Sequence, residues 1–148
     1  MPHQRASAEQ LLWERSCPAA ITSDVIWNLD VYRASLFLRH VSRRDCAALS
    51  ADRVGDQLAG QLARATGSVG ANLGEGYSRP SRADRIRFLN YALGSTREAI
   101  TWYHASSTLL PQDLIEERLL LLVRIRSLLL GLIKSLRAKE NTAAPFEP

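Results

Sequence analysis

The sequence predicts an all-α fold, an antiparallel up-down four-helix bundle, from three features of its 148 residues. Apolar residues recur at intervals of three and four, the period of an amphipathic helix, in four successive segments. Turn signals separate these segments, and no stretch alternates apolar and polar residues as a half-buried strand does. We expect the bundle over residues 24–138, between an irregular N-terminal arm (1–23) and a disordered C-terminal tail (139–148).

The first predicted helix runs from Asp24, a candidate N-cap, to Arg44, and residues 45–51 form the connection that follows it. The second begins near Asp52 and ends at Gly76, a candidate C-cap. Glycines at every seventh position of this second helix favour close approach of a neighbouring backbone, and they are Gly60, Gly67 and Gly74.

The third predicted helix has the clearest start signal in the chain. Pro80 precedes Ser81, a candidate N-cap, and Asp84 follows three residues later in an acidic version of the capping box. We expect this helix to continue until Pro111 and the fourth to span Gln112–Ala138. The fourth helix is apolar over more than one face, so it is either central to the bundle or packed against another subunit.

The charge of the chain is moderately basic, with 19 Lys and Arg against 15 Asp and Glu and a formal net charge of +4. Only two of the cations are lysines, and guanidinium groups suit bidentate phosphate contacts, although a genome rich in arginine codons explains the same excess. Two clusters are candidate sites for nucleic acid or, alternatively, solvated helix ends. The first contains Arg39, Arg43 and Arg44, and the second contains Arg79, Arg82, Arg85 and Arg87.

Several classes of protein are disfavoured by the sequence. The N-terminus lacks an apolar secretory core, and charged residues interrupt the longest apolar stretch, so we expect neither a signal peptide nor a membrane span. Cys17 and Cys46 match no zinc-ligand spacing, which favours reduced thiols and a cytoplasmic location. His3, His40 and His104 form no ligand set, so we expect no metal and no cofactor.

A motif across the second and third predicted helices resembles a known family. The segment 68–76 (SVGANLGEG), then Arg79 and Ser81, then RFL at 87–89 and ALGS at 92–95 with Glu98 resemble proteins encoded in intervening sequences of bacterial 23S ribosomal RNA genes. The resemblance covers about residues 24–137, and Gly70 and Gly74 depart from it where the family usually has proline and alanine. The residues of its structural motif are Asn72, Glu75, Gly76, Ser81, Phe88, Gly94, Ser95 and Glu98.

The resemblance implies a cytosolic homopentamer of antiparallel bundles, arranged as a barrel and without established catalytic activity. The same fold is shared with the accessory variability determinant of diversity-generating retroelements, which binds nucleic acid and a reverse transcriptase. We therefore expect a non-enzymatic scaffold whose arginines bind RNA or DNA phosphates without base readout. The alternative is an adaptor for a reverse transcriptase, and a hydrolase that uses Glu75 or Glu98 ranks last.

Overall fold

The fold is that of a computed structural model of the chain, and residues 5–141 are described. These residues form helices and connections without any strand, so the all-α prediction is confirmed for them. In chain order the elements are α1 (Ala8–Arg15), α2 (Ala19–Thr22), the 3-10 helix η2 (Val25–Asn28), α3 (Asp30–Leu49), α4 (Arg53–Tyr77), α5 (Arg82–Ala105) and α6 (Gln112–Asn141).

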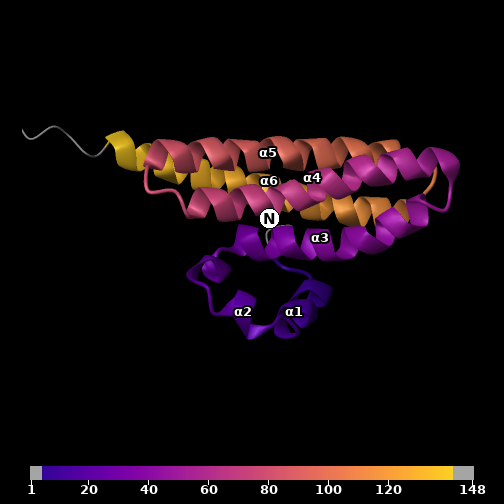
Figure 1. Ribbon diagram of the computed structural model, residues 1–148, viewed down its shortest axis with the longest axis horizontal. Coiled ribbons are helices and arrows are strands. Elements are labelled where there is room, and N and C mark those ends of the chain that lie inside the picture. Colours follow the sequence, from indigo (N-terminus) through magenta and orange to yellow (C-terminus); the bar gives the residue numbers. More distant parts are fainter. Residues whose placement is uncertain (1–4, 142–148) are drawn as a thin grey trace, which may run out of the picture.

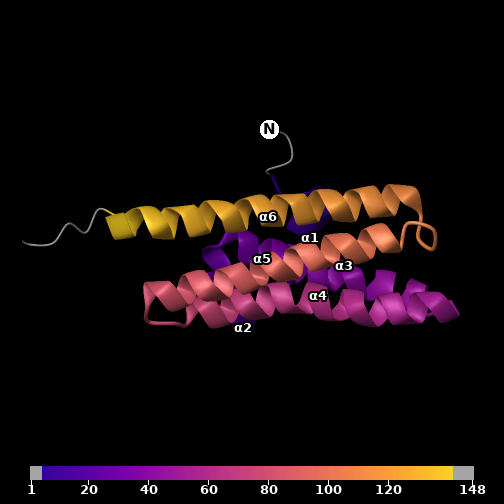
Figure 2. The ribbon, with the colours of Figure 1, turned by 90° about the horizontal axis from the view of Figure 1, so that it is seen from above.

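The four long helices lie side by side and run in alternating directions (Figures 1 and 2). Each packs against the next in the chain, and α3 also packs against α6. Their apolar stripes meet in one core, in which the most deeply buried side chains include Leu38, Leu62, Tyr103, Leu122 and Leu129. Removal of these side chains from water is the main stabilising term of the fold.

Two helix starts follow from local side-chain chemistry. The Asp52 carboxylate accepts hydrogen bonds from the backbone N–H groups of Val54 and Gly55, at 2.8 and 2.9 Å. The Ser81 hydroxyl accepts one from the Asp84 N–H at 3.1 Å and donates to the Asp84 carboxylate at 2.9 Å. The predicted N-cap Ser81 is confirmed, and Asp52 caps the helix that was expected to begin near it, because each side chain supplies acceptors to otherwise unpaired N–H groups.

The first two predicted helices differ from the structure at their ends. Asp24 caps η2 instead of a long helix, by accepting from the Ile26 N–H at 3.0 Å. Helix α3 begins at Asp30 and continues through the predicted connection to Leu49, because Asp45 and Leu49 are buried and hold this last turn in the core. Helix α4 ends at Tyr77 with Ser78 as its C-cap.

Gly76 is therefore not a C-cap. No glycine in residues 5–141 has a positive φ, and Gly76 lies inside α4. The predicted third helix also ends early: α5 stops at Ala105, and a turn precedes Pro111. Helix α6 extends to Asn141, so it takes in the first three residues of the predicted tail, whereas residues 142–148 lie outside the described chain.

The segment expected to be an irregular arm contains α1 and α2. The Ser7 hydroxyl caps α1 by accepting from the Gln10 N–H at 3.1 Å. On the inner side of α1, the Trp13 ring lies against Trp27, Phe37 and His40, with centroid distances of 6.4, 5.6 and 5.5 Å. This aromatic cluster attaches α1 to α3.

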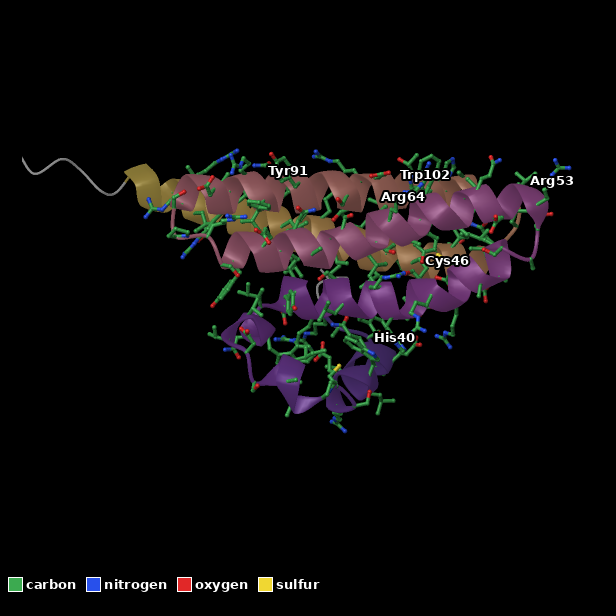
Figure 3. The ribbon with its side chains drawn as sticks, in the orientation of Figure 1. His40, Cys46, Arg53, Arg64, Tyr91 and Trp102 are labelled. Carbon is green, nitrogen blue, oxygen red and sulfur yellow. The ribbon has the colours of Figure 1, made fainter. Side chains whose placement is uncertain are left out.

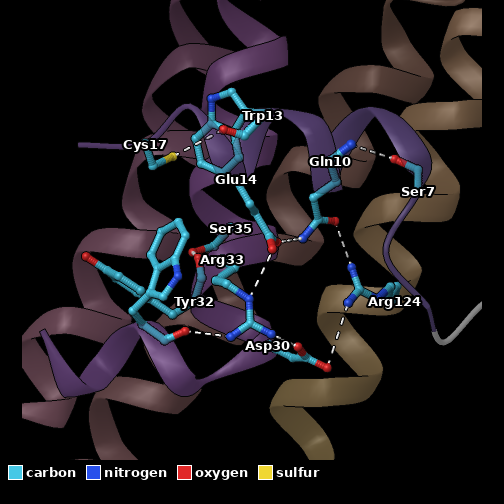
Figure 4. Close-up of polar contacts among 11 residues, drawn as sticks. Ser7, Gln10, Trp13, Glu14, Cys17, Asp30, Tyr32, Arg33, Ser35 and Arg124 are labelled. Atoms are coloured by element: carbon cyan, nitrogen blue, oxygen red, sulfur yellow. Dashed lines mark hydrogen bonds and ion pairs between the residues drawn. The ribbon is translucent and has the colours of Figure 1, made fainter. Parts of the chain in front are cut away.

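A polar network adds to this attachment (Figure 4). The side chain of Gln10, only 1% exposed, donates to Glu14 at 2.7 Å and accepts from Arg124 of α6 at 2.9 Å. Arg124 also lies 4.0 Å from the Asp30 carboxylate, and Arg33 lies 3.5 Å from Glu14. Burying a polar group without a hydrogen-bond partner costs free energy, so this network fixes the position in which α1 packs against α3 and α6.

The structure also bears on two predictions from the sequence, the lack of a membrane span and the reduced state of the two cysteines. None of the helices within residues 5–141 is both long and apolar enough to cross a bilayer. Cys17 and Cys46 are free thiols, each partly buried, and burial raises the pKa of both.

Candidate nucleic-acid interface

The first predicted arginine cluster divides between two sides of α3. Arg44 turns toward α1 and forms an exposed ion pair with Glu9 at 3.2 Å. Arg39 turns toward α4, where its Nε would lie 3.7 Å from a Cβ built on Gly67. Arg43 lies one helical turn after Arg39 and is exposed on the same side of α3.

A third arginine, Arg64 of α4 (labelled in Figure 3), is exposed and lies about one helical turn before Gly67, the glycine beside which Arg39 extends. Its Nη1 would lie 3.7 Å from a Cβ built on Gly60. Within the described chain, none of these three guanidinium groups has a carboxylate within ion-pair distance. We call Arg39, Arg43 and Arg64 the α3–α4 arginine strip.

Sequence reasoning missed Arg64, and a signal for it was present. Arg64 lies between Gly60 and Gly67, and it occupies the position of α4 opposite the buried stripe that contains Leu62 and Val69. The helical period therefore places Arg64 on the outer face, and the glycines leave room for its side chain.

The second predicted cluster surrounds the turn between α4 and α5 and is partly neutralised. Arg79 pairs with Glu75, and Arg87 pairs with Asp84 at 2.8 Å. Arg85 donates its Nε–H to the Arg79 carbonyl at 2.6 Å, which closes the turn. Arg82, at the start of α5, is exposed and forms no ion pair with any described residue.

Aromatic and guanidinium side chains lie together on the part of α5 that follows this turn. The Cζ of Arg79 lies 4.8 Å from the centre of the Phe88 ring, and that of Arg87 lies 5.7 Å from it. Tyr91 meets Phe88 edge to face, with ring centres 5.5 Å apart and an interplanar angle of 83°. The Cβ of Phe88 would lie 2.8 Å from a Cβ on Gly76, so a glycine is needed there.

Two polar residues of the motif, Asn72 and Glu98, form hydrogen bonds within their own helices. The Asn72 amide donates to the Ser68 carbonyl of its own helix at 2.9 Å, and Glu98 accepts from the Trp102 indole at 3.2 Å. Ser95 is half-buried and Gly94 is exposed. Residues 5–141 hold no group of three or more side chains suited to a metal ion.

A buried polar cluster that the sequence analysis did not identify joins α3, α5 and α6. The Asp45 carboxylate accepts from Arg118 at 2.8 Å and from the Tyr103 hydroxyl at 2.7 Å. Burial lowers the Arg118 pKa, but the hydrogen bond and charge of Asp45 outweigh it and raise that pKa overall. Burial and then the Asp45 charge raise the pKa of the Tyr103 phenol far above its usual value of about 10. With all three polar side chains paired and buried, this cluster is structural.

Comparison with known proteins gives a match to a family model and matches to solved structures. The sequence model of a family described as 23S rRNA-intervening sequence protein matches residues 28–130. A crystal structure of a protein of unknown function from the S23 ribosomal protein family of Bacteroides thetaiotaomicron is similar, with 26% identity and a TM-score of 0.67. The similarity covers 70% of this chain and 98% of that one. No curated protein matches the chain.

Proposed function

The chain belongs to the family of 23S rRNA-intervening sequence proteins, and from this membership we propose that it is a non-enzymatic, cytoplasmic protein that binds RNA or DNA phosphates as a homo-oligomer. The family's name refers to ribosomal RNA, which makes a polyanion the natural partner to consider. The two arginine clusters supply the contacts, and the binding does not depend on base sequence.

The observation that supports this proposal best is the α3–α4 arginine strip. Several other arginines are already paired with carboxylates, but Arg39, Arg43 and Arg64 are at least partly exposed and have no carboxylate within ion-pair distance among the described residues. Glycine at positions 60 and 67 leaves the helix surface beside two of these guanidinium groups without bulky side chains. A phosphate backbone can therefore approach closely, and arginine forms bidentate contacts with it.

The second cluster contributes more weakly in this proposal. Of its four arginines, Arg79 and Arg87 already pair with carboxylates, whereas Arg82 and Arg85 form no ion pair within residues 5–141. Arg44 of the first cluster is likewise paired with Glu9. We therefore assign the larger share of phosphate binding to the α3–α4 arginine strip.

In this proposal, assembly of several copies of the chain strengthens the binding of RNA or DNA phosphates. We propose that the four long helices form an antiparallel up-down bundle and that five bundles associate as a barrel. Leucines on the outer side of α6 support this assembly, since Leu120 and Leu130 are 48% and 45% exposed. A pentamer would carry five times the formal charge of +4 of one chain, and the release of counterions grows with the number of neutralised phosphates.

The test is a charge reversal with a matched control. We expect the Arg39→Glu/Arg43→Glu variant to lose at least about tenfold in affinity for RNA and DNA, because two phosphate contacts are replaced by repulsion. Fluorescence anisotropy from about 50 to 200 mM salt measures this affinity and its salt dependence. The control variant, Arg97→Glu/Arg137→Glu, changes the net charge equally at two exposed positions on α5 and α6.

Two results would contradict the proposal. The first is wild-type binding that is absent or does not change with salt. The second is an equal loss of affinity in both variants, because the net charge alone would then account for binding. Circular dichroism checks that both variants keep the helical content of the wild type.

A further inference from the structure

Helix α5 presents an exposed aromatic ring that packs against a second, fixed ring. Tyr91 is 52% exposed and lies on the outer side of α5 (Figure 3). The edge-to-face contact with Phe88 backs its ring. Phe88 is itself fixed, because it packs against Gly76 and has the guanidinium groups of Arg79 and Arg87 near its ring.

Cationic groups lie within reach of this ring. Arg87 precedes Tyr91 by one helical turn on the same face of α5, roughly 6 Å along the helix axis. Its partner Asp84 is also partly exposed, and exposed ion pairs contribute little, so a phosphate can replace this carboxylate. Four arginines and two carboxylates, Glu75 and Asp84, surround the turn, which leaves a local excess of positive charge.

A backed aromatic ring beside a guanidinium group is the arrangement with which proteins bind unpaired bases. Bases stack on aromatic faces, and arginine contacts the adjoining phosphates. In a duplex the base faces are already stacked on their neighbours, so an exposed ring on a helix surface has no base face to bind. A stacking ring would therefore bind single strands in preference to duplexes. The α3–α4 arginine strip contacts phosphates, which both kinds of strand carry, so it gives no such preference.

We propose that Tyr91, backed by Phe88, stacks an unpaired base of a single-stranded nucleic acid while Arg87 contacts the adjoining phosphate. This inference rests on the proposed function, because it adds strand selectivity to the phosphate binding proposed above. Its substrate class is single-stranded RNA or DNA, without preference for one base.

The experiment compares full-length Tyr91→Leu with the wild type on two probes. These are a labelled single-stranded oligothymidylate of about 16 nucleotides and a labelled mixed-sequence duplex of the same length. We expect Tyr91→Leu to lower the affinity for the single strand roughly 5- to 150-fold, the effect of losing one stacked base, and to leave the affinity for the duplex unchanged. Tyr91→Phe keeps the ring and is expected to bind like the wild type.

The outcomes separate this inference from the proposed function. If Tyr91→Leu binds both probes like the wild type, or weakens both equally, the stacking site is overturned and the phosphate binding stands. If the wild type binds neither probe, the proposed function fails as well. Light scattering must give Tyr91→Leu the same solution mass as the wild type, because a lower mass would assign Tyr91 to a contact between copies and overturn the inference.

Discussion

At the scale of single residues, the buried cluster of Asp45, Tyr103 and Arg118 is the feature that sequence patterns could not predict. Tyr103 and Arg118 follow Asp45 by 58 and 73 positions in the chain, and the three residues lie on three different helices. Asp45 and Arg118 resemble ordinary polar positions of amphipathic helices, and only the packing of α3, α5 and α6 places them together. The caps at Asp52 and Ser81 were predictable because each hydrogen bond closes within three residues.

The Tyr103 phenol makes the stability of the protein sensitive to alkaline pH. Its folded-state pKa is raised, so its contribution is fully present below pH of about 10 and is lost as the pH rises further, because the unfolded phenol ionises and the folded one does not. We expect the free energy of unfolding to fall above that pH. We expect Tyr103→Phe to reduce the slope of this fall and to cost about 1.5–3 kcal/mol at neutral pH through the lost hydrogen bond to a carboxylate.

Urea unfolding at a series of pH values measures both effects. Tyr91→Phe is the control, because it removes a hydroxyl from an exposed tyrosine. An alkaline slope that is the same in Tyr103→Phe as in the wild type would contradict this prediction.

At the scale of elements, the helices were predicted better than their ends. The apolar period indicated the four long helices, since it reports which face of a helix is buried. Their ends depend on tertiary contacts: burial of Asp45 and Leu49 extends α3 beyond the predicted Arg44. Helix α1 was missed because its attachment depends on Trp13 and Gln10, whose partners lie on distant elements.

The seven-residue spacing of glycines in α4 predicted close approach of a neighbouring backbone at each of them, and the structure does not show this at every one. A Cβ added to Gly74 would meet no atom of another described residue within 4 Å, whereas one added to Gly76, two residues later, would be crowded by Phe88. Close approach within the subunit therefore occurs at Gly76 and does not occur at Gly74.

This difference predicts opposite effects of two alanine substitutions on one helix. We expect Gly74→Ala to raise the free energy of unfolding by up to about 1 kcal/mol, because alanine favours the helix and meets no neighbour there. We expect Gly76→Ala to lower it by about 1–3 kcal/mol, since the new Cβ would lie 2.8 Å from the Phe88 Cβ and force a shift. Chemical denaturation measures both values. If Gly74→Ala destabilises the protein as Gly76→Ala does, another backbone must approach Gly74, as between copies in the proposed assembly.

At the scale of the whole molecule, the apolar residues of α6 divide into a buried set and an exposed set. Leu122, Ile125 and Leu129 are fully buried in one subunit. Leu120 and Leu130 reach solvent. The sequence pattern could not separate the two sets, because an apolar residue that packs inside its own chain gives the same pattern as one that packs against another chain.

The exposed part of α6 yields a test of the proposed assembly. We expect the wild type at micromolar concentration to show a mass several times that of one 16.5 kDa chain, before and after nuclease treatment, by size exclusion with light scattering. Leu120→Glu/Leu130→Glu places two charges on the outer side of α6, where burial against another copy would leave them unpaired, so we expect a monomer. Val54→Glu, at a 68% exposed position of α4, is the control for an added charge on a surface apolar residue. A wild type that is already monomeric, or a double variant with unchanged mass, would assign the exposed leucines no role in assembly, and the affinity for polyanions would then depend on one subunit's arginines alone.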